Sequence, residues 1–143
     1  MSRPLQEPVG LQVARVAKLL SRAFDDALAE AGGSMPTWLI LLSLKRERWG
    51  NQRELAEAVG IQGATLTHHL DGLEASGLIS RRRDPDNRRV HIVELTDEGD
   101  AAFHRLRKAA TAFDRRLRAG IAEPEVDELR GLLDRLAANA EAA

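Results

Sequence analysis

The sequence contains no cysteine among its 143 residues. This absence excludes structural disulfides, thiolate zinc sites, iron–sulfur clusters and redox sensing by cysteine. Long apolar runs are missing as well, because the longest, residues 38–42, is far below the roughly 20 residues that a membrane-spanning helix needs. The N-terminus carries Arg3 without the apolar stretch of a signal peptide. We therefore expect a cytoplasmic protein without membrane contact.

Neither sign of charge is in large excess. The net charge is −1, so no protein-wide basic field attracts nucleic acid, and such binding would depend on local charge. Residues 81–89 hold five Arg and two Asp, or +3, whereas residues 123–143 hold six acids and two Arg, or −4. An apolar content of 43% and a charged content of 30% are typical of a globular protein. A chain of this length buries about 68% of its unfolded surface, and we predict one domain, residues 1–143.

Two helices are predicted in the first third of the chain. Apolar residues recur at steps of three and four over residues 9–31, which is the spacing of one helix face. Gly32 and Gly33 end this helix. Pro36 stands where the next helix can begin, because the first turn needs no N–H group from it. This second helix is mostly apolar and extends to Lys45.

The next segment has the pattern of a helix–turn–helix. Asn51 and Glu54 have the spacing of a capping box at the start of the first helix. Gly60 supplies a left-handed stop, and the second helix covers residues 62–76 before Gly77 ends it. A short turn containing glycine is the connection expected between two steeply crossing helices.

A basic β-hairpin follows directly, in the stretch RRRDPDNRRVHIVELT of residues 81–96. Its turn, residues 84–87, combines proline, aspartate and asparagine. In the second strand, the predicted apolar period-2 set is Val90 and Ile92, with a shift at Leu95. A cationic hairpin beside a helix pair fits a polyanion, with one part in each groove. The alternative is a solvated hairpin whose arginines only confer solubility.

After the hairpin, Thr96 caps a long helix and Glu123 begins a last one. The predicted fold class is mainly α with a small β-hairpin. A winged helix–turn–helix core, residues 34–96, lies between amphipathic helices at 9–31 and 97–140. These terminal helices need a partner surface. They cover each other within one chain or build a two-fold dimer, and we favour the dimer.

These patterns together resemble the MarR family of bacterial transcription regulators over residues 9–140. The resemblance is carried by the helix–turn–helix NQRELAEAVGIQGATLTHHLDGLEASGLI, by the wing RRRDPDNRRVHIVELT and by Trp38 in the second helix. Arg88–Arg89 and Leu95–Thr96 match the family's wing at the right spacing. Asn87 departs from the pattern, because the family usually has Asp there.

The resemblance implies an obligate homodimer whose N- and C-terminal helices form the dimer interface. Each recognition helix would enter the major groove of a pseudo-palindromic double-stranded DNA operator, and each wing would reach a minor groove. It also implies control of nearby genes, often relieved by small aromatic or phenolic ligands. We therefore predict a sequence-specific repressor that a small aromatic ligand releases from DNA. No cofactor is expected.

The predicted DNA contacts come from the N-terminal half of the second helix of the pair and from the wing. Gln and Thr read base edges, and Thr also bonds phosphate. His68 stands where the family often has Arg, so its contact is weaker and depends on pH. Gln62 is a poorer N-cap than the usual Ser or Thr. The predicted DNA-binding residues are Gln62, Gly63, Thr65, Thr67, His68, Arg83, Arg88 and Arg89.

Within the wing, Arg88 and Arg89 are the main candidates. One should enter the minor groove, where A·T tracts concentrate negative potential, and the other should contact phosphate or brace the wing. Residues 81–83 alternate between the faces of the first strand, so not all three arginines can face DNA. Asn87 accepts a hydrogen bond but brings no charge, so we expect a weaker brace than Asp would give.

Three residues are candidates for a ligand pocket, and each has a plainer alternative. His69 stands where the family normally has an aliphatic residue, and is either a ligand or proton-sensing contact or a partly buried histidine. Arg15 is either a partner for a ligand carboxylate or an exposed surface arginine. Trp38 either lines the same crevice or belongs to the core.

Metal binding and catalysis have little support in the sequence. His68 and His69 point about 100° apart on a helix and cannot chelate one ion. No nucleophile elbow, glycine-rich phosphate loop or close carboxylate pair is visible, so we predict no metal site, no catalytic residue and no enzyme. A winged-helix protein-interaction module without DNA binding is the main alternative, and a small-molecule enzyme is a more remote one.

Overall fold

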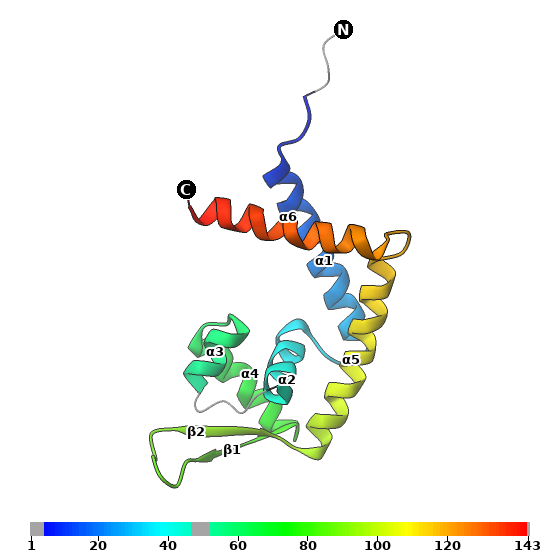
Figure 1. Cartoon of the computed structure of the whole chain (residues 1–143). Coiled ribbons are helices and arrows are strands. Elements are labelled where there is room, and N and C mark those ends of the chain that lie inside the picture. Colours follow the sequence, from blue (N-terminus) through cyan, green and yellow to red (C-terminus); the bar gives the residue numbers. More distant parts are fainter. Residues whose placement is uncertain (1–4, 47–51, 143) are drawn as a thin grey trace. The chain divides into compact units, whose positions relative to one another are not determined.

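The computed structural model describes residues 5–46 and 52–142. Within these ranges the chain forms six helices and one two-stranded antiparallel sheet (Figure 1). The elements are α1 (Val9–Glu30), α2 (Met35–Arg46), α3 (Gln52–Val59), α4 (Gly63–Ala75), β1 (Ile79–Arg83), β2 (His91–Leu95), α5 (Asp97–Leu117) and α6 (Glu123–Glu141). The predicted fold class and element order are confirmed. The predicted cap at Asn51 lies outside the described residues.

The chain divides into two compact units, residues 1–110 and 111–143. In the first unit, α2, α3 and α4 gather beside the β1–β2 hairpin (Figure 1). Their inward side chains form one apolar cluster that the first half of α5 completes. Trp38 belongs to this core: it is 9% exposed and stacks on Phe103 with ring centroids 5.6 Å apart. The largest fully buried side chains are Leu28, Ile40, Leu41, Leu55, Leu66, Leu70 and Leu106.

The helix–turn–helix is closed by main-chain hydrogen bonds at its glycine. Gly60 has a φ of 77°, a left-handed conformation that glycine adopts without steric cost. The amides of Gly60 and Ile61 both donate to the Ala56 carbonyl, at 2.9 and 3.1 Å, which satisfies an acceptor at the end of α3. The predicted glycine stop is therefore confirmed, and α4 starts three residues after Gly60.

The register of the hairpin corrects the predicted apolar set of the second strand. Ile79 pairs with Leu95 and Arg81 with Val93, so Val93, at 4% exposure, lies on the inward face in place of Val90 and Ile92. The reason is that side chains alternate strictly along a strand. Leu95 fixes the phase at the base of the hairpin, and counting back in twos from it reaches Val93 and not Ile92.

Thr96 joins the hairpin to α5, as its predicted capping role requires. Its Oγ1 accepts a hydrogen bond from the Gly99 amide at 3.0 Å, and its hydroxyl donates to the Gly77 carbonyl at 2.6 Å. Gly99 lies so close to the base of β1 that an added Cβ would stand 1.9 Å from the Leu78 carbonyl oxygen. The first turn of α5 and the base of the wing are therefore one packed unit.

A second joint connects α1 to α2 and α5. The Met35 amide at the start of α2 donates to Asp25 Oδ1 on α1 at 3.0 Å. Arg105 Nε on α5 donates to the Ala31 carbonyl at 2.8 Å. Lys45 on α2 also forms an ion pair with Asp100 on α5, and the hydrogen bond from Lys45 is the main cause of the lowered pKa of Asp100. These polar contacts surround the apolar core.

The second unit contains the end of α5, the turn after it and α6. Arg118 in the turn donates to both carboxylate oxygens of Glu123 at 2.9 Å, and the Ala122 amide donates to Glu125 at 3.1 Å. The apolar stripe of α6 stays exposed: Leu129, Leu132, Leu133 and Leu136 are between 39% and 50% exposed.

No single helix in the described residues is both long enough and apolar enough to cross a membrane. The consecutive helices α1 and α2 meet the length and composition criteria only when joined, and they are bent by 76° at their junction.

Candidate nucleic-acid interface

The predicted reading residues on α4 form an exposed surface at its N-terminal half. Gln62, Gly63, Thr65, Thr67 and His68 are all exposed. Gln62 occupies the N-cap position without a side-chain capping hydrogen bond, in agreement with its poor capping tendency. Its side-chain amide is therefore not used to cap the start of α4 and is available to a ligand.

Thr67 connects α4 to the start of α3. Its hydroxyl donates to the Gly63 carbonyl at 3.0 Å, and its Oγ1 accepts a hydrogen bond from Gln52 Nε2 at 3.4 Å. Gln52 and its neighbour Arg53 thus lie beside the recognition helix, although they were not among the predicted site residues. The signal that would have indicated them is their position in the first turn of α3, where free amides and cations favour phosphate.

The wing arginines divide into a paired and an unpaired group. Arg81 points inward from β1, with its side chain 16% exposed, and forms ion pairs with Asp71 and Glu74 of α4. Arg82 pairs with Glu94 across the hairpin at 3.3 Å. In the part of the chain that the structure describes, the side chains of the other three, Arg83, Arg88 and Arg89, form no hydrogen bond or ion pair.

The ion pairs of Arg81 attach the wing to the recognition helix. Glu74 accepts from the Arg81 main-chain amide and from its Nη2, both at 3.1 Å. The hydrogen bond from the Arg81 side chain, aided by its charge, lowers the pKa of Glu74. The same pairing raises the pKa of Arg81. Arg81 therefore connects β1 to α4 through both its main chain and its side chain.

The tip of the wing is shaped by two side chains that bond to the main chain. Asp84 Oδ1 accepts from the Asp86 amide at 2.9 Å, which is an Asx turn. Asn87 Oδ1 accepts from the Arg89 amide at 3.2 Å. Asn87 thus uses its acceptor to fix the backbone that carries Arg89, and it leaves the guanidinium group of Arg89 exposed to solvent.

An open crevice of about 570 Å³ runs between the start of α3, Thr67 on α4 and the outer end of the wing. Arg53 and Arg89 bring cations to its lining, and Gln52 and Thr67 bring hydrogen-bonding groups. Arg81 also lines the crevice, but its charge is paired with Asp71 and Glu74. Such a combination suits a phosphate of a nucleic-acid backbone, because phosphate contacts come from Arg, Lys and polar side chains. The recognition helix and the wing therefore border one continuous polar surface.

The structure does not bring the three ligand-pocket candidates together. Arg15 on α1 donates to Glu7 through Nε at 3.2 Å and through Nη2 at 3.0 Å. Trp38 is packed in the core. His69 is half-buried on α4, with its ring centroid 6.0 Å from that of exposed His68. No cluster of three or more His, Cys, Asp or Glu in the described ranges has the geometry to hold a metal ion.

An exposed helix of a helix–turn–helix beside a cationic wing defines a winged helix–turn–helix regulator, and comparison with known proteins gives the family. The model of the MarR family matches residues 34–91. A Bacillus subtilis protein described as the uncharacterized HTH-type transcriptional regulator YdgJ is 36% identical over 87 residues. That match covers 61% of this chain and 51% of YdgJ, so the chain matches about half the length of this relative.

Solved structures match nearly the whole chain. The transcriptional repressor CouR, bound to a 23-mer DNA duplex, is 30% identical with a TM-score of 0.83 and covers 94% of this chain and 99% of its own. The transcriptional regulator PA3341 is 34% identical with a TM-score of 0.78, and the match covers 95% of this chain and 100% of PA3341. CouR from Rhodococcus jostii RHA1 bound to p-coumaroyl-CoA is 27% identical with a TM-score of 0.77, and the match covers 95% of this chain and 96% of that CouR chain. This chain belongs to the MarR family, whose members in these comparisons are transcriptional regulators and not enzymes.

Proposed function

We propose that this protein is a homodimeric repressor that binds a pseudo-palindromic double-stranded DNA operator in the bacterial cytoplasm and leaves it when a small aromatic ligand binds. Residues 34–96 form the DNA-reading lobe, and the helices in 9–31 and 97–140 form the dimer. The observation that carries the proposal is the division of the wing arginines. Arg81 and Arg82 are paired, whereas Arg88 and Arg89 extend from the tip without a partner in the described residues.

The proposed docking follows from the positions of these groups. The N-terminal half of α4 enters the major groove, where Gln62, Thr65 and His68 reach base edges or phosphate. Thr67 and Gly63 lie in the same half of the helix and would stand close to the sugar–phosphate backbone of the DNA. Arg88 or Arg89 enters the adjacent minor groove, and Arg83 with the other contacts phosphate. CouR, whose structure contains a DNA duplex, is a precedent for this fold on DNA.

The dimer is supported by apolar surface on helices that cannot stay exposed in water without cost. On α6, four leucines are at least 39% exposed. On α1, Val9 is 59% exposed and Val13 is 37% exposed. A two-fold interface would cover such faces on both copies at once.

The ligand response is proposed from relatives and from α1. A related CouR structure contains p-coumaroyl-CoA, an aromatic thioester, and Arg15 offers a guanidinium group suited to an anionic oxygen pair. Of the other two candidates, half-buried His69 is retained as a ligand contact, and core-packed Trp38 would act only by shaping the wall of a pocket.

The test of DNA binding is a gel shift on operators selected from genomic fragments. Replacing Arg88 and Arg89 with Ala should weaken binding by about 1–3 kcal/mol per specific contact, with Lys108→Ala on α5 as a control for charge. Protection should cover two half-sites whose centres lie about one helical turn, or 10 bp, apart. An unchanged affinity for the arginine variants would refute the wing assignment, and a single half-site would refute the dimer.

The alternative, an interaction module without DNA binding, makes a different prediction. A DNA-binding protein is retained on heparin or random duplex DNA and is released steeply by salt, because counterions are exchanged at each phosphate contact. Elution at low salt from both matrices, with the fold intact by circular dichroism, would support the interaction module instead.

A further inference from the structure

A row of cations lies on one face of α1, on the side away from its main apolar stripe. Arg15, Lys18 and Arg22 follow one another at steps of three and four, which places them on one face of the helix. Val13 and Leu20 are each two residues from one of these cations, so they point about 160° away from it. The cationic face is therefore separate from the stripe proposed for dimerisation.

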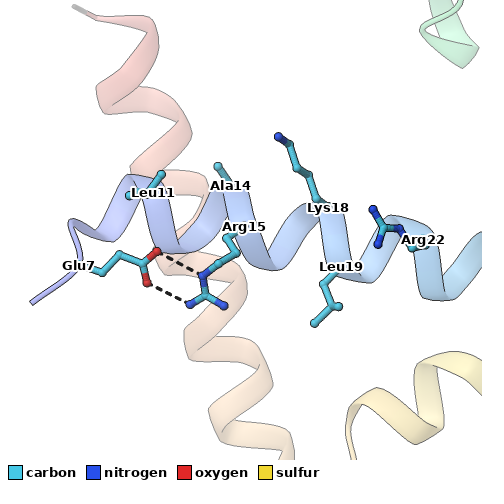
Figure 2. Close-up of a pocket in the computed structure, with 7 residues that line it drawn as sticks. All are labelled: Glu7, Leu11, Ala14, Arg15, Lys18, Leu19 and Arg22. Atoms are coloured by element: carbon cyan, nitrogen blue, oxygen red, sulfur yellow. Dashed lines mark hydrogen bonds and ion pairs between the residues drawn. The ribbon is translucent and has the colours of Figure 1, made fainter.

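The cations line an open groove of about 540 Å³ (Figure 2). Its other walls include Leu11 and Leu19, which are 58% and 63% exposed. The groove thus combines apolar surface with three positive charges and a single acid, Glu7. In the described residues, Lys18 and Arg22 form no hydrogen bond or ion pair.

The first cation of the row, Arg15, already forms an ion pair with Glu7. Glu7 precedes α1, and its two carboxylate oxygens accept hydrogen bonds from Nε and Nη2 of Arg15, further along the helix (Figure 2). This two-point geometry is the one with which arginine binds a carboxylate or phosphate of a ligand. Arg15 remains 60% exposed and Glu7 35% exposed, and pairs of this kind are weak. An incoming anion can therefore displace Glu7 at little cost.

We propose that this groove is the anionic-effector site of the protein and that Glu7 is a built-in competitor for it. The effector class is an amphiphile with an apolar body against Leu11 and Leu19 and anionic oxygens against the cations. The inference rests on the proposed ligand response and adds its site and its regulation. Arg15 and Arg22 are seven residues apart, about 10.5 Å along the helix, so a ligand with phosphates beyond its first anion engages the whole row.

The experiment is calorimetric titration of the full chain with 4-hydroxycinnamate and with its coenzyme A thioester. Glu7→Gln should tighten binding of both probes by about two- to fivefold, the range of an exposed ion pair. Arg15→Gln should weaken both by about tenfold or more, because a charge-assisted two-point contact is lost. Lys18→Gln and Arg22→Gln should weaken only the thioester if phosphates use the row. Equal weakening of the free acid by Arg22→Gln would contradict the proposal, because one carboxylate on Arg15 cannot reach Arg22, seven residues further along the helix.

The decisive comparison is the double variant Glu7→Gln, Arg15→Gln. If Glu7 acts by occupying Arg15, the gain from Glu7→Gln disappears when Arg15 is absent. A gain that persists, no gain at all, or no binding of either probe would overturn the proposal. So would a loss of dimer in Arg15→Gln by light scattering, since the groove would then be a contact between copies. Gel shifts of the same variants without probe test the proposed DNA binding separately, because no groove residue belongs to the DNA-reading surface.

Discussion

Gly99, in the first turn of α5, packs against the base of the wing, and replacing it with alanine tests this packing by adding one methyl group. An alanine at position 99 would place its Cβ 1.9 Å from the Leu78 carbonyl oxygen and 3.1 Å from Leu95 Cδ2. Because the nearest atom belongs to the backbone, no side-chain rotation can relieve the overlap. The first turn of α5 or the base of β1 must then move. Forcing an extra methyl into a packed site costs about 1–3 kcal/mol, and sometimes more.

A matched control exists on α4. Gly72 is also a helical glycine, but beyond the neighbouring backbone of its own helix an added Cβ would meet no atom within 4 Å. Gly72→Ala should therefore stabilise the protein by about 0.5–1 kcal/mol, because alanine loses less backbone entropy in a helix. Position 72 lies outside the predicted DNA-binding residues, so this variant should bind operator like the original protein.

The measurement is urea unfolding of Gly99→Ala and Gly72→Ala at one protomer concentration, since association would shift the transition. The two variants should move in opposite directions, with Gly99→Ala less stable by about 1–3 kcal/mol. If Gly99→Ala unfolds at the same urea concentration as the original protein or at a higher one, then Gly99 does not pack against the hairpin as described.

Two further predictions concern charge. Glu74 has a lowered pKa because Arg81 binds its ionised form; this stabilisation is present above the ordinary pKa of 4.5 and is lost as pH falls through the lowered value in the folded protein. The urea midpoint of Arg81→Gln should therefore lie below that of the original protein at pH 7, and the gap should close towards pH 3. A gap independent of pH would refute the pairing. His68→Arg should tighten binding to any duplex and raise the salt slope by about 1, by adding one phosphate contact; an unchanged slope in gel shifts across salt would place position 68 off the DNA.

The elements whose signals are local could be predicted from the sequence. Glycines at 60 and 77 end their helices in left-handed conformations with φ near 78°, which few other residues adopt. Thr96 caps α5 because its hydroxyl needs only a neighbour three residues away. The reading face of α4 follows from helical spacing alone, and its residues are exposed as that spacing requires.

Features that depend on distant parts of the chain could not be predicted. The phase of β2 depends on which residue faces Ile79. The sequence around β2 fits two alternating apolar sets, Val90 with Ile92 and Val93 with Leu95, and only the pairing of Ile79 with Leu95 selects the second. The pairing of Arg81 with α4 requires knowing that the inward face of β1 passes over Glu74. Gln52 and Arg53 are ordinary helix-start residues in sequence. Only the packing of α3 against α4 places them beside Thr67.

The division of the arginines explains how a chain of net charge −1 can recognise a polyanion. Non-specific DNA affinity grows with the number of phosphates that a protein neutralises, and pairing removes Arg81 and Arg82 from that number. At the wing tip, the unpaired side chains of Arg88 and Arg89 extend from a turn that Asn87 shapes through a main-chain bond. In the proposed complex, the paired arginines position the wing and the unpaired ones contact DNA, so binding would depend on the angle between α4 and the hairpin more than on total charge. In the same proposal, a ligand-driven shift that loosens Arg81 from Glu74 would weaken DNA binding without covering any of the predicted contact residues.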